Sequence, residues 1–243
     1  MLFSIITVSF NSSRTIEQTI TSVLSQRNVE FEYIIIDGAS NDGTQEIIEK
    51  YKDRLAYYIS EPDCGISDAF NKGISKAKGD IIGIINSDDI LLEGALEYVK
   101  NSILDNTDVF CGRIKKFTSI SEIPRIEIDK NTKIIHFDDL RKRMVISHPA
   151  TFVRNTTYRK YGVFDVSYRY SMDRELMLRM YLKGAKFQQS NMILTLFRDD
   201  GITGTHFLRS IDESYKISIR YGTNRITANW VRIKKIIRFK FLK

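Results

Sequence analysis

The chain has 243 residues, of which 42% are hydrophobic and 28% are charged. This composition supports a full globular core and excludes wholesale disorder, and the length fits one domain with at most a small appendage. Cys64 and Cys111 stand far apart and in no metal-binding spacing, which favours a reduced, cytosolic compartment. No apolar run is long enough to span a membrane, and the start lacks the basic segment of a signal peptide.

The excess basic charge of the chain lies at its C-terminal end. The formal net charge is +7, and residues 225–243 hold seven basic residues and no acidic one. The remaining 30 basic residues balance the 30 acidic ones. A nucleic-acid-binding protein would normally spread its excess charge over a binding face, so the neutral body argues against that class.

Strands and helices alternate over the first hundred residues. Apolar runs rich in β-branched residues predict strands at residues 3–9, 31–36, 55–60 and 80–86. Helical spacing of apolar residues predicts helices at residues 14–26, around 47–51 and at 66–78. This alternation is typical of βαβ units, and it predicts an α/β fold with a mostly parallel sheet flanked by helices.

After residue 108 the pattern changes. The segments 109–117 and 120–128 are predicted as paired strands, and further strands are predicted at 148–154 and 187–197. Helices are predicted at 171–182 and from His206 to the end. We therefore expect one domain over residues 1–222, with a nucleotide-binding half (1–105) and a second half that presents another substrate (106–222), followed by a helix over residues 223–243.

Acidic residues gather where the predicted strands end. Asp37 follows the second strand, and Asn86-Ser87-Asp88-Asp89 follows the fourth. Ligands of open α/β sheets bind at the carboxyl ends of the strands, and carboxylates clustered there usually hold a divalent cation and a phosphate-bearing ligand. The sequence thus indicates a nucleotide-using enzyme. The turn after the first strand has no glycine, which argues against an NAD-dependent enzyme.

Several of these residues also have a purely structural interpretation. Asp37 could cap the turn that follows it or hold the base or ribose of a nucleotide, and its position alone does not decide. Asp89 could cap a helix that begins near Leu92, which would leave Asp88 available to a ligand.

The second half holds one more candidate acid. Asp173 could be a general base, or it could favour the N-terminus of a helix capped by Ser171, and the spacing alone favours the helix-end role. His148 precedes a proline, which favours extended backbone there. His136 and His206 have no metal-ligand spacing.

Five ordered motifs match one protein family. They read Ser4-Ile5-Ile6-Thr7-Val8-Ser9-Phe10-Asn11, Ile36-Asp37-Gly38-Ala39-Ser40-Asn41-Asp42-Gly43-Thr44, Glu61-Pro62-Asp63-x-Gly65-Ile66-x-Asp68-Ala69-x-Asn71-Lys72-Gly73, Asn86-x-Asp88-Asp89 and Ser171-x-Asp173-x-Glu175-Leu176. Together they resemble family 2 glycosyltransferases, which are inverting enzymes with the GT-A fold, and most of all the small bacterial enzymes of surface-polysaccharide assembly. The resemblance covers residues 1–222.

The resemblance implies roles on the donor side. It implies that Thr7, Ser9 and Asp37 hold the nucleotide, usually uridine, and that Asp63 and Asp68 line the donor pocket. It thereby implies a UDP-sugar donor and a GT-A-like fold with a smaller acceptor-side region and C-terminal helices.

The resemblance also implies the reacting groups. Asp88 would be the metal-binding acid of the Asp-x-Asp motif, Asp173 the catalytic base, and His148 a residue near the acceptor or the diphosphate. One departure is that Asn86 stands at the first acidic position of the motif, on the donor side, and it brings no charge. A Mg²⁺ or Mn²⁺ ion would then rest on Asp88, with the diphosphate and waters completing its shell.

The expected protein is a metal-dependent, inverting hexosyltransferase that uses a UDP-sugar and a saccharide or lipid-diphosphate-linked saccharide acceptor. It would be cytoplasmic and peripheral at the inner face of the cell membrane. A sugar nucleotidyltransferase is disfavoured because no glycine- and basic-rich phosphate loop occurs near the start. A non-catalytic nucleotide-sugar-binding or membrane-associated module of the same fold is the other alternative, and it would release UDP without an acceptor-dependent product.

Residues 229–243 carry the pattern of a basic amphipathic helix. Trp230, Ile233, Ile237 and Phe241 recur on one stripe, with basic residues around it. Such a helix can lie in a membrane interface, where each Lys or Arg near an anionic leaflet contributes about 1 kcal/mol of attraction. It could instead pack its stripe on the domain. The concentration of the net charge in this segment favours the membrane.

Overall fold

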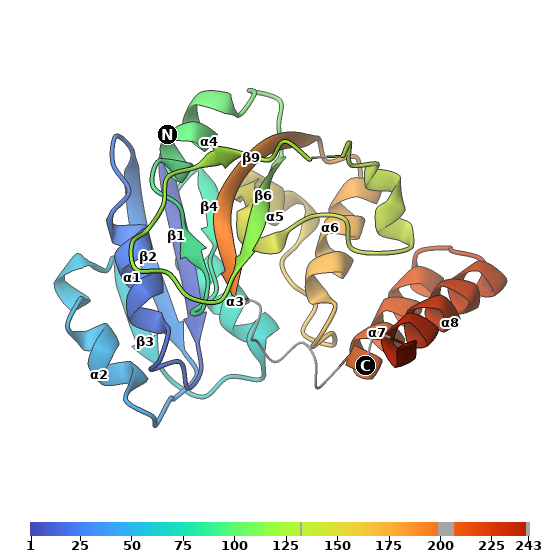
Figure 1. Ribbon diagram of the computed structural model, residues 1–243, viewed down its shortest axis with the longest axis horizontal. Helices are drawn as coiled ribbons and strands as arrows, with labels where there is room; N and C mark the ends of the chain where they lie inside the picture. The colour runs from blue at the N-terminus through green and yellow to red at the C-terminus, as the bar shows by residue number, and fades with distance from the viewer. Residues whose placement is uncertain (132, 199–206, 242–243) are drawn as a thin grey trace.

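The computed structural model describes residues 1–131, 133–198 and 207–241, the last four of these by their backbone. One mixed sheet runs through the molecule (Figure 1). From edge to edge its strands are β3 (Tyr57–Ser60), β2 (Glu30–Asp37), β1 (Leu2–Ser9), β4 (Ile81–Ile84), β8 (Thr151–Arg154), β6 (Val109–Phe117), β9 (Phe187–Arg198) and β5 (Ile90–Leu91). The short strand β7 (Glu127–Ile128) also pairs with β9.

Strands β1 to β4 form the parallel half of the sheet, as the sequence predicted. They are rich in isoleucine because both faces of the sheet are covered, and buried parallel strands favour continuous apolar runs. Their register brings the last residues of three strands side by side: Ser9 pairs with Asp37, and Asp37 pairs with Ser60. The polar strand ends therefore share one edge of the sheet.

Helices cover both faces of the sheet. On one face the core includes buried side chains from α1 (Ile16–Leu24), α2 (Thr44–Glu49) and α4 (Ala95–Ser102). On the other it includes buried side chains from α3 (Ile66–Lys76), α5 (Asn155–Tyr161) and α6 (Met172–Leu182). Short 3-10 turns lie at η1 (Lys52–Arg54), η2 (Phe137–Arg141) and η3 (His148–Ala150). The sandwich of helix, sheet and helix confirms the predicted α/β class.

The second half of the chain adds strands of both directions. Strand β8 runs antiparallel to β4 and β6, and β9 runs parallel to β6. The start of β8 and the end of β9 therefore reach the same edge as the carboxyl ends of β1 to β4. This geometry brings η3, just before β8, and Arg198, at the end of β9, to the candidate site.

Two strand predictions in this half were wrong in detail. Residues 109–117 form β6, but it pairs with β8 and β9 rather than with residues 120–128, of which the last two form β7. Apolar residues of the intervening segment instead pack beside β5 and β9, namely Ile120, Ile123 and Ile126. Residues 148–150 form a 3-10 turn around Pro149, so strand β8 begins at Thr151.

Helices α7 (Phe207–Arg220) and α8 (Arg225–Phe241) form a pair at the end of the molecule opposite α2 (Figure 1). They confirm the predicted C-terminal helices, while His206 lies outside the described residues. Within the described part of the chain, no helix combines the length and the apolar character needed to cross a membrane.

Candidate active site at the carboxyl edge of the sheet

Asp37 is the centre of a buried cluster of hydroxyl groups. Its Oδ1 accepts hydrogen bonds from the hydroxyls of Ser9 at 2.8 Å and Ser40 at 2.6 Å. Its Oδ2 accepts from the backbone N–H of Ser40 at 2.9 Å and the hydroxyl of Ser60 at 2.6 Å. The side chain is 0% exposed, and four donors fill the acceptor capacity of a carboxylate. Asp37 thus caps the turn after β2 and fixes the serines at three neighbouring positions of the site edge.

Asp63 lies directly against this turn. A Cβ atom added at Gly38 would sit only 2.7 Å from Asp63 Oδ2, so the glycine is what lets the carboxylate approach. Asp63 Oδ1 accepts a hydrogen bond from the backbone N–H of Gly65 at 2.7 Å, just before α3. On the first turn of α3, Asp68 accepts from the N–H of Cys64 and lies 3.7 Å from the ammonium of Lys72. Both predicted donor-side acids therefore reach this edge.

The loop after β4 carries the Asn86-Ser87-Asp88-Asp89 sequence. The amide of Asn86 donates to Asp89 Oδ2 at 2.9 Å, and the hydroxyls of Ser87 and Ser12 lie 2.8 Å apart. Asp89 is fully buried, and burial, together with the charge of Asp88, raises its pKa to about 7. The predicted helix cap at Asp89 was wrong, because α4 begins at Ala95 after Gly94. Asp89 instead lies buried inside the loop, where it accepts the hydrogen bond from Asn86. Asp88 is partly exposed at the rim of the loop.

Arg198, at the end of β9, fixes this loop from the other side. Its Nε donates to the carbonyl oxygen of Asp88 at 3.2 Å, and its Nη2 donates to Gln18 Oε1 at 2.8 Å. Its guanidinium also lies over the ring of Phe117, 4.5 Å from the centroid. The backbone of Asp88 is thus held by a cation whose remaining contacts tie α1 and β6 to the site.

The residues of this loop fit a divalent cation only in part. Within the described residues, no three His, Cys, Asp or Glu side chains gather closely enough to hold a metal by themselves. Asn86 is neutral and its amide nitrogen is engaged by Asp89, so Asp88 is the acid at the rim. A hard cation prefers oxygen ligands, and here most of them would have to come from a bound diphosphate and water.

His148 and Asp173 are buried near the same edge, close enough to interact electrostatically. The imidazole of His148 packs on Phe70 and Phe164, with ring centroids 5.4 Å and 5.9 Å away. Burial lowers the pKa of His148 and raises the pKa of Asp173, while each group favours the charged form of the other. A carboxylate whose pKa is raised by desolvation is a better proton acceptor than an exposed one.

The start of α6, where Asp173 lies, is held by α7. Glu213 accepts hydrogen bonds from the backbone N–H groups of Arg169, Tyr170 and Ser171 at 2.7–2.9 Å. Ser171 is the residue before the helix, but its hydroxyl donates to the carbonyl of Ser210 rather than capping α6. Glu213 thus holds the residues just before α6. Within the first turn, Asp173 Oδ1 accepts a hydrogen bond from the backbone N–H of Arg174 at 2.7 Å, so Asp173 also contributes to the helix end.

Arg174 fixes the same helix from the adjacent position. It is 1% exposed and donates to the carbonyl oxygens of Leu140, Arg141 and Ser214 and to the hydroxyl of Ser218. Every one of these partners is neutral, so burial lowers the pKa of Arg174 to about 10 in spite of the nearby Asp173. Arg174 thereby links α6 to η2 and to α7.

One predicted donor residue does not reach the site. Thr7 is 0% exposed, and its Oγ1 accepts a hydrogen bond from the hydroxyl of Tyr33 at 2.9 Å. It lies two residues before the end of β1, where the strand is covered by the core on both faces. Ser9, at the strand end, is the residue of this segment that the structure places beside Asp37.

Sequence reasoning missed three supporting residues. Ser40 and Ser60 bind Asp37, and Arg198 binds the loop of Asp88. Ser60 ends a predicted strand in the same way as Asp37, and this shared position was the available signal. No local pattern marks Arg198, because its place follows from the non-local pairing of β9 with β6.

Comparisons with known proteins agree with this architecture. The family described as "Glycosyl transferase family 2" matches residues 4–165. The Escherichia coli UDP-Glc:alpha-D-GlcNAc-diphosphoundecaprenol beta-1,3-glucosyltransferase WfaP is 30% identical over 81% of this chain and 77% of its own. A glycosyltransferase of Mycobacterium tuberculosis is 30% identical over 74% of this chain and 68% of its own.

Solved structures share the fold. The crystal structure of residues 1–349 of Staphylococcus aureus TarS superposes with a TM-score of 0.69 at 18% identity, over 97% of this chain and 71% of that one. The mannosyltransferase PcManGT from Pyrobaculum calidifontis, in complex with GDP-Man and Mn²⁺, gives a TM-score of 0.70 at 14% identity, over 95% and 67%. The predicted GT-A-like fold is confirmed, and the chain belongs to glycosyltransferase family 2.

Proposed function

We propose that this glycosyltransferase transfers a hexose or N-acetylhexosamine from a UDP-sugar to a lipid-linked saccharide, with inversion, in bacterial surface-polysaccharide synthesis. The observation that carries the proposal is the shared edge: the serines and acids of the β1–β4 ends lie on the same side of the sheet as Asp173. Helix α3 spans the two groups, since it carries Asp68 at its start and Phe70 against His148.

The relatives support the choice of donor and acceptor. TarS has been solved in complex with UDP-GlcNAc and with UDP, and the name of WfaP describes a UDP-glucose donor and a diphosphoundecaprenol-linked acceptor. Another relative is the poly(ribitol-phosphate) β-N-acetylglucosaminyltransferase TarP of S. aureus. We infer the same chemical classes here, with the enzyme acting from the cytoplasm at the inner face of the cell membrane.

Asp88 would hold a Mg²⁺ or Mn²⁺ ion together with the donor diphosphate. When bound, such an ion neutralises the charge that develops on the leaving diphosphate. The residues of the chain have separate tasks. Asp63 and Asp68 shape the donor pocket beside α3, Asn86 orients the loop, and Ser9 with the Asp37 cluster receives the nucleoside.

Asp173 would accept the proton of the acceptor hydroxyl. A hydroxyl is a poor nucleophile until a base removes its proton, and a carboxylate within hydrogen-bond reach suits this task. Attack on the anomeric carbon from the face opposite the diphosphate breaks the sugar–phosphate bond in one displacement, so the anomeric configuration inverts. His148 would stabilise the carboxylate form of Asp173 beside the incoming acceptor.

The proposed base predicts a pH dependence. Only the carboxylate form of Asp173 accepts a proton, and burial raises the pKa of Asp173 above its ordinary value. Activity should therefore be lost as the pH falls through this raised pKa, so the acidic limb of kcat/KM should have its midpoint above 3.8. A steady-state profile, with circular dichroism at each pH to confirm folding, measures it. A midpoint at or below 3.8 in folded protein would contradict the assignment.

The Asp37 cluster predicts the effect of a second substitution. Asp37→Ala should weaken the binding of UDP itself by at least about tenfold. The change removes the charged acceptor of hydrogen bonds worth about 1.5–3 kcal/mol each, and it thereby frees the three serine hydroxyls that the carboxylate positions. Calorimetry with UDP measures the effect. Asp80→Ala is the matched control, since Asp80 accepts from the N–H of Leu2 at the opposite end of the strands. Equal UDP affinity in folded Asp37→Ala would refute the role.

A screen of UDP-sugars tests the function as a whole. Binding is measured by calorimetry with and without Mn²⁺, and the binders are then offered with lipid-diphosphate-linked saccharides as acceptors. The proposal expects metal-dependent binding of at least one UDP-sugar and an acceptor-dependent product. UDP release with no such product would favour the non-catalytic alternative, and binding confined to GDP-sugars would contradict the donor class.

A further inference from the structure

Helix α8 presents a continuous apolar stripe to solvent. The stripe, Ile226, Trp230, Ile233 and Ile237, repeats at helical spacing, and its members are 81%, 58%, 47% and 49% exposed. Four large apolar side chains in a row on one helix face are costly to leave in water. A surface of this kind indicates a partner that covers it.

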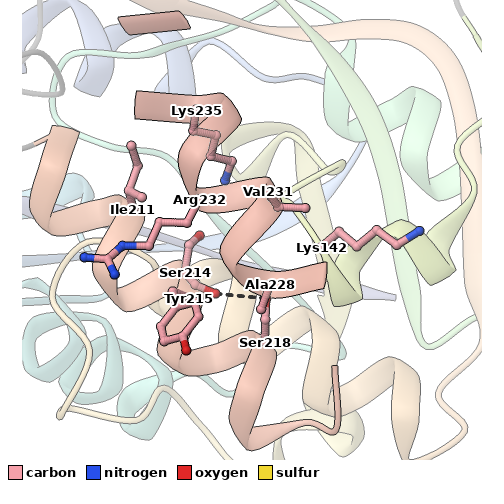
Figure 2. A pocket seen from close by; sticks show the side chains of 9 residues that line it. All are labelled: Lys142, Ile211, Ser214, Tyr215, Ser218, Ala228, Val231, Arg232 and Lys235. Carbon is pink, nitrogen blue, oxygen red and sulfur yellow. Dashed lines mark hydrogen bonds between the residues drawn. The ribbon is translucent and has the colours of Figure 1, made fainter. Parts of the chain in front are cut away.

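The opposite face of α8 is the one that packs on the protein. Ala228 is buried, and Arg232 and Lys235 turn toward the gap between α8 and α7, while Val231 points toward Lys142, as Figure 2 shows. Arg232 forms an ion pair of 2.7 Å with Asp212. The gap left between the helices has a volume of about 10 Å³, which is roughly the room of one water molecule. The packing of α8 is thus complete without its apolar stripe.

Basic groups accompany the stripe. The ammonium of Lys234 lies 4.9 Å from the centroid of the Trp230 ring, and Arg225 is exposed at the start of the helix. Residues 225–243 contain no acidic residue. A helix with an apolar stripe, a Trp and basic neighbours has the chemistry of a segment that lies in the interface of an anionic membrane.

We propose that the outer face of α8 docks this enzyme onto the surface of a membrane rich in anionic lipids. Charge complementarity selects this occupant. A second copy would bring two acid-free basic faces together, and a nucleic acid would match the charges but leave the isoleucines in water. Anionic headgroups with acyl chains beneath them satisfy both the basic groups and the apolar stripe.

The docked helix connects rigidly to the catalytic side of the molecule. α8 packs on α7, and α7 holds the residues before α6 through Glu213 and binds Arg174, the neighbour of Asp173. Docking would therefore hold the candidate base at a fixed height above the lipid surface. This benefit rests on the proposed function, whereas the docking itself does not and can be tested without donor or acceptor.

Trp230 offers a direct readout, because it is the single tryptophan of the chain. The full chain is mixed with vesicles of phosphatidylglycerol and phosphatidylcholine, or of phosphatidylcholine alone, and the emission and iodide quenching of Trp230 are recorded with vesicle cosedimentation. Anionic vesicles should shift the emission to the blue, protect Trp230 from iodide and sediment the protein. Raising the salt to 1 M should weaken binding, because the screening length falls to about 3 Å.

A matched pair of variants keeps the fluorophore and tests the stripe. I226A/I233A/I237A should lower the partition onto anionic vesicles by at least about tenfold. L104A/I134A/V166A, which shortens three exposed apolar residues elsewhere on the protein, should leave it unchanged. Both variants alter exposed side chains, and circular dichroism confirms their fold.

Several outcomes would overturn the docking surface. One is sedimentation with Trp230 still open to iodide, and another is equal binding to neutral vesicles. Protection that grows with protein concentration in the absence of lipid would assign the face to a second copy. Equal loss of binding in both variants, or no binding of the full chain at low salt, would also contradict the proposal.

Discussion

Replacing Asp173 with asparagine should lower the rate of sugar transfer by at least about 100-fold, the lower end of what general-base catalysis contributes. The amide keeps the size of the side chain but cannot take the proton of the acceptor hydroxyl. Donor affinity should change little, because the nucleotide side of the site is built from the ends of β1 to β4. Initial rates with saturating donor, together with donor affinity by calorimetry, measure both quantities.

The structure separates this result from a purely structural role. Glu213 holds the residues before α6 and Arg174 anchors the helix. An amide oxygen can still accept the N–H of Arg174 that Asp173 now accepts, so the helix should remain in place in the variant. Asp138→Asn changes an exposed acid of η2 and is the matched control, with near-normal turnover expected. If Asp173→Asn also turns over normally, the base lies elsewhere and Asp173 serves only the helix end.

Asp88→Ala should abolish metal-dependent donor binding while the protein stays folded. Asp88 is the acid at the rim of its loop, since Asn86 is neutral and Asp89 is buried with a pKa raised to about 7. The fold should persist because Arg198 holds the loop through the backbone carbonyl of Asp88, which the substitution retains. Calorimetric titration of the UDP-sugar, with and without Mn²⁺, measures the loss.

Two comparisons make the Asp88 result specific. The control is Asp80→Ala, which changes an exposed acid at the far end of β4. This change should leave the response of donor binding to Mn²⁺ intact. Addition of a chelator to the wild-type protein should reproduce the Asp88→Ala behaviour. Donor binding that is indifferent to both the chelator and Asp88→Ala would remove the metal from the mechanism.

The parallel half of the sheet was predictable because its signals are local. The strands of the parallel half are short apolar runs that end on polar residues, and the positions of Asp37 and Asp88 at one edge follow from parallel pairing. The buried position of Thr7 could not be recognised from the local sequence pattern. It is a polar residue inside a buried strand, and its hydroxyl is satisfied by Tyr33 on the neighbouring strand.

The second half of the chain was harder to predict because its strand pairing is non-local. β6 joins β8 and β9, which follow it by more than thirty residues, instead of the apolar segment next to it. The pairing of β9 determines where Arg198 lies, and the antiparallel course of β8 determines where His148 lies. The contacts of Glu213 with the residues before α6 depend on a helix that comes later in the chain, so local spacing could not show them.

The C-terminal helix shows a third reason why the sequence pattern alone does not place every residue. Its stripe was visible in the sequence, but periodicity does not tell which side of a helix faces the protein. The packing of Ala228 against α7 settles this for the described residues, and it leaves Trp230 outside. Of the predicted stripe, Trp230, Ile233 and Ile237 face solvent, and the side chain of Phe241 lies outside the described residues. The partner of the stripe is a matter for the vesicle experiment.

The anomeric configuration of the product tests the central claim most directly. The enzyme is incubated with the α-linked UDP-sugar that it binds and with a lipid-diphosphate-linked saccharide, and the new linkage is examined by proton NMR. Attack by an acceptor hydroxyl activated by Asp173, on the face opposite the diphosphate, predicts a β-linked product. An α-linked product, or free sugar as the sole product, would contradict a single displacement onto the acceptor at this site.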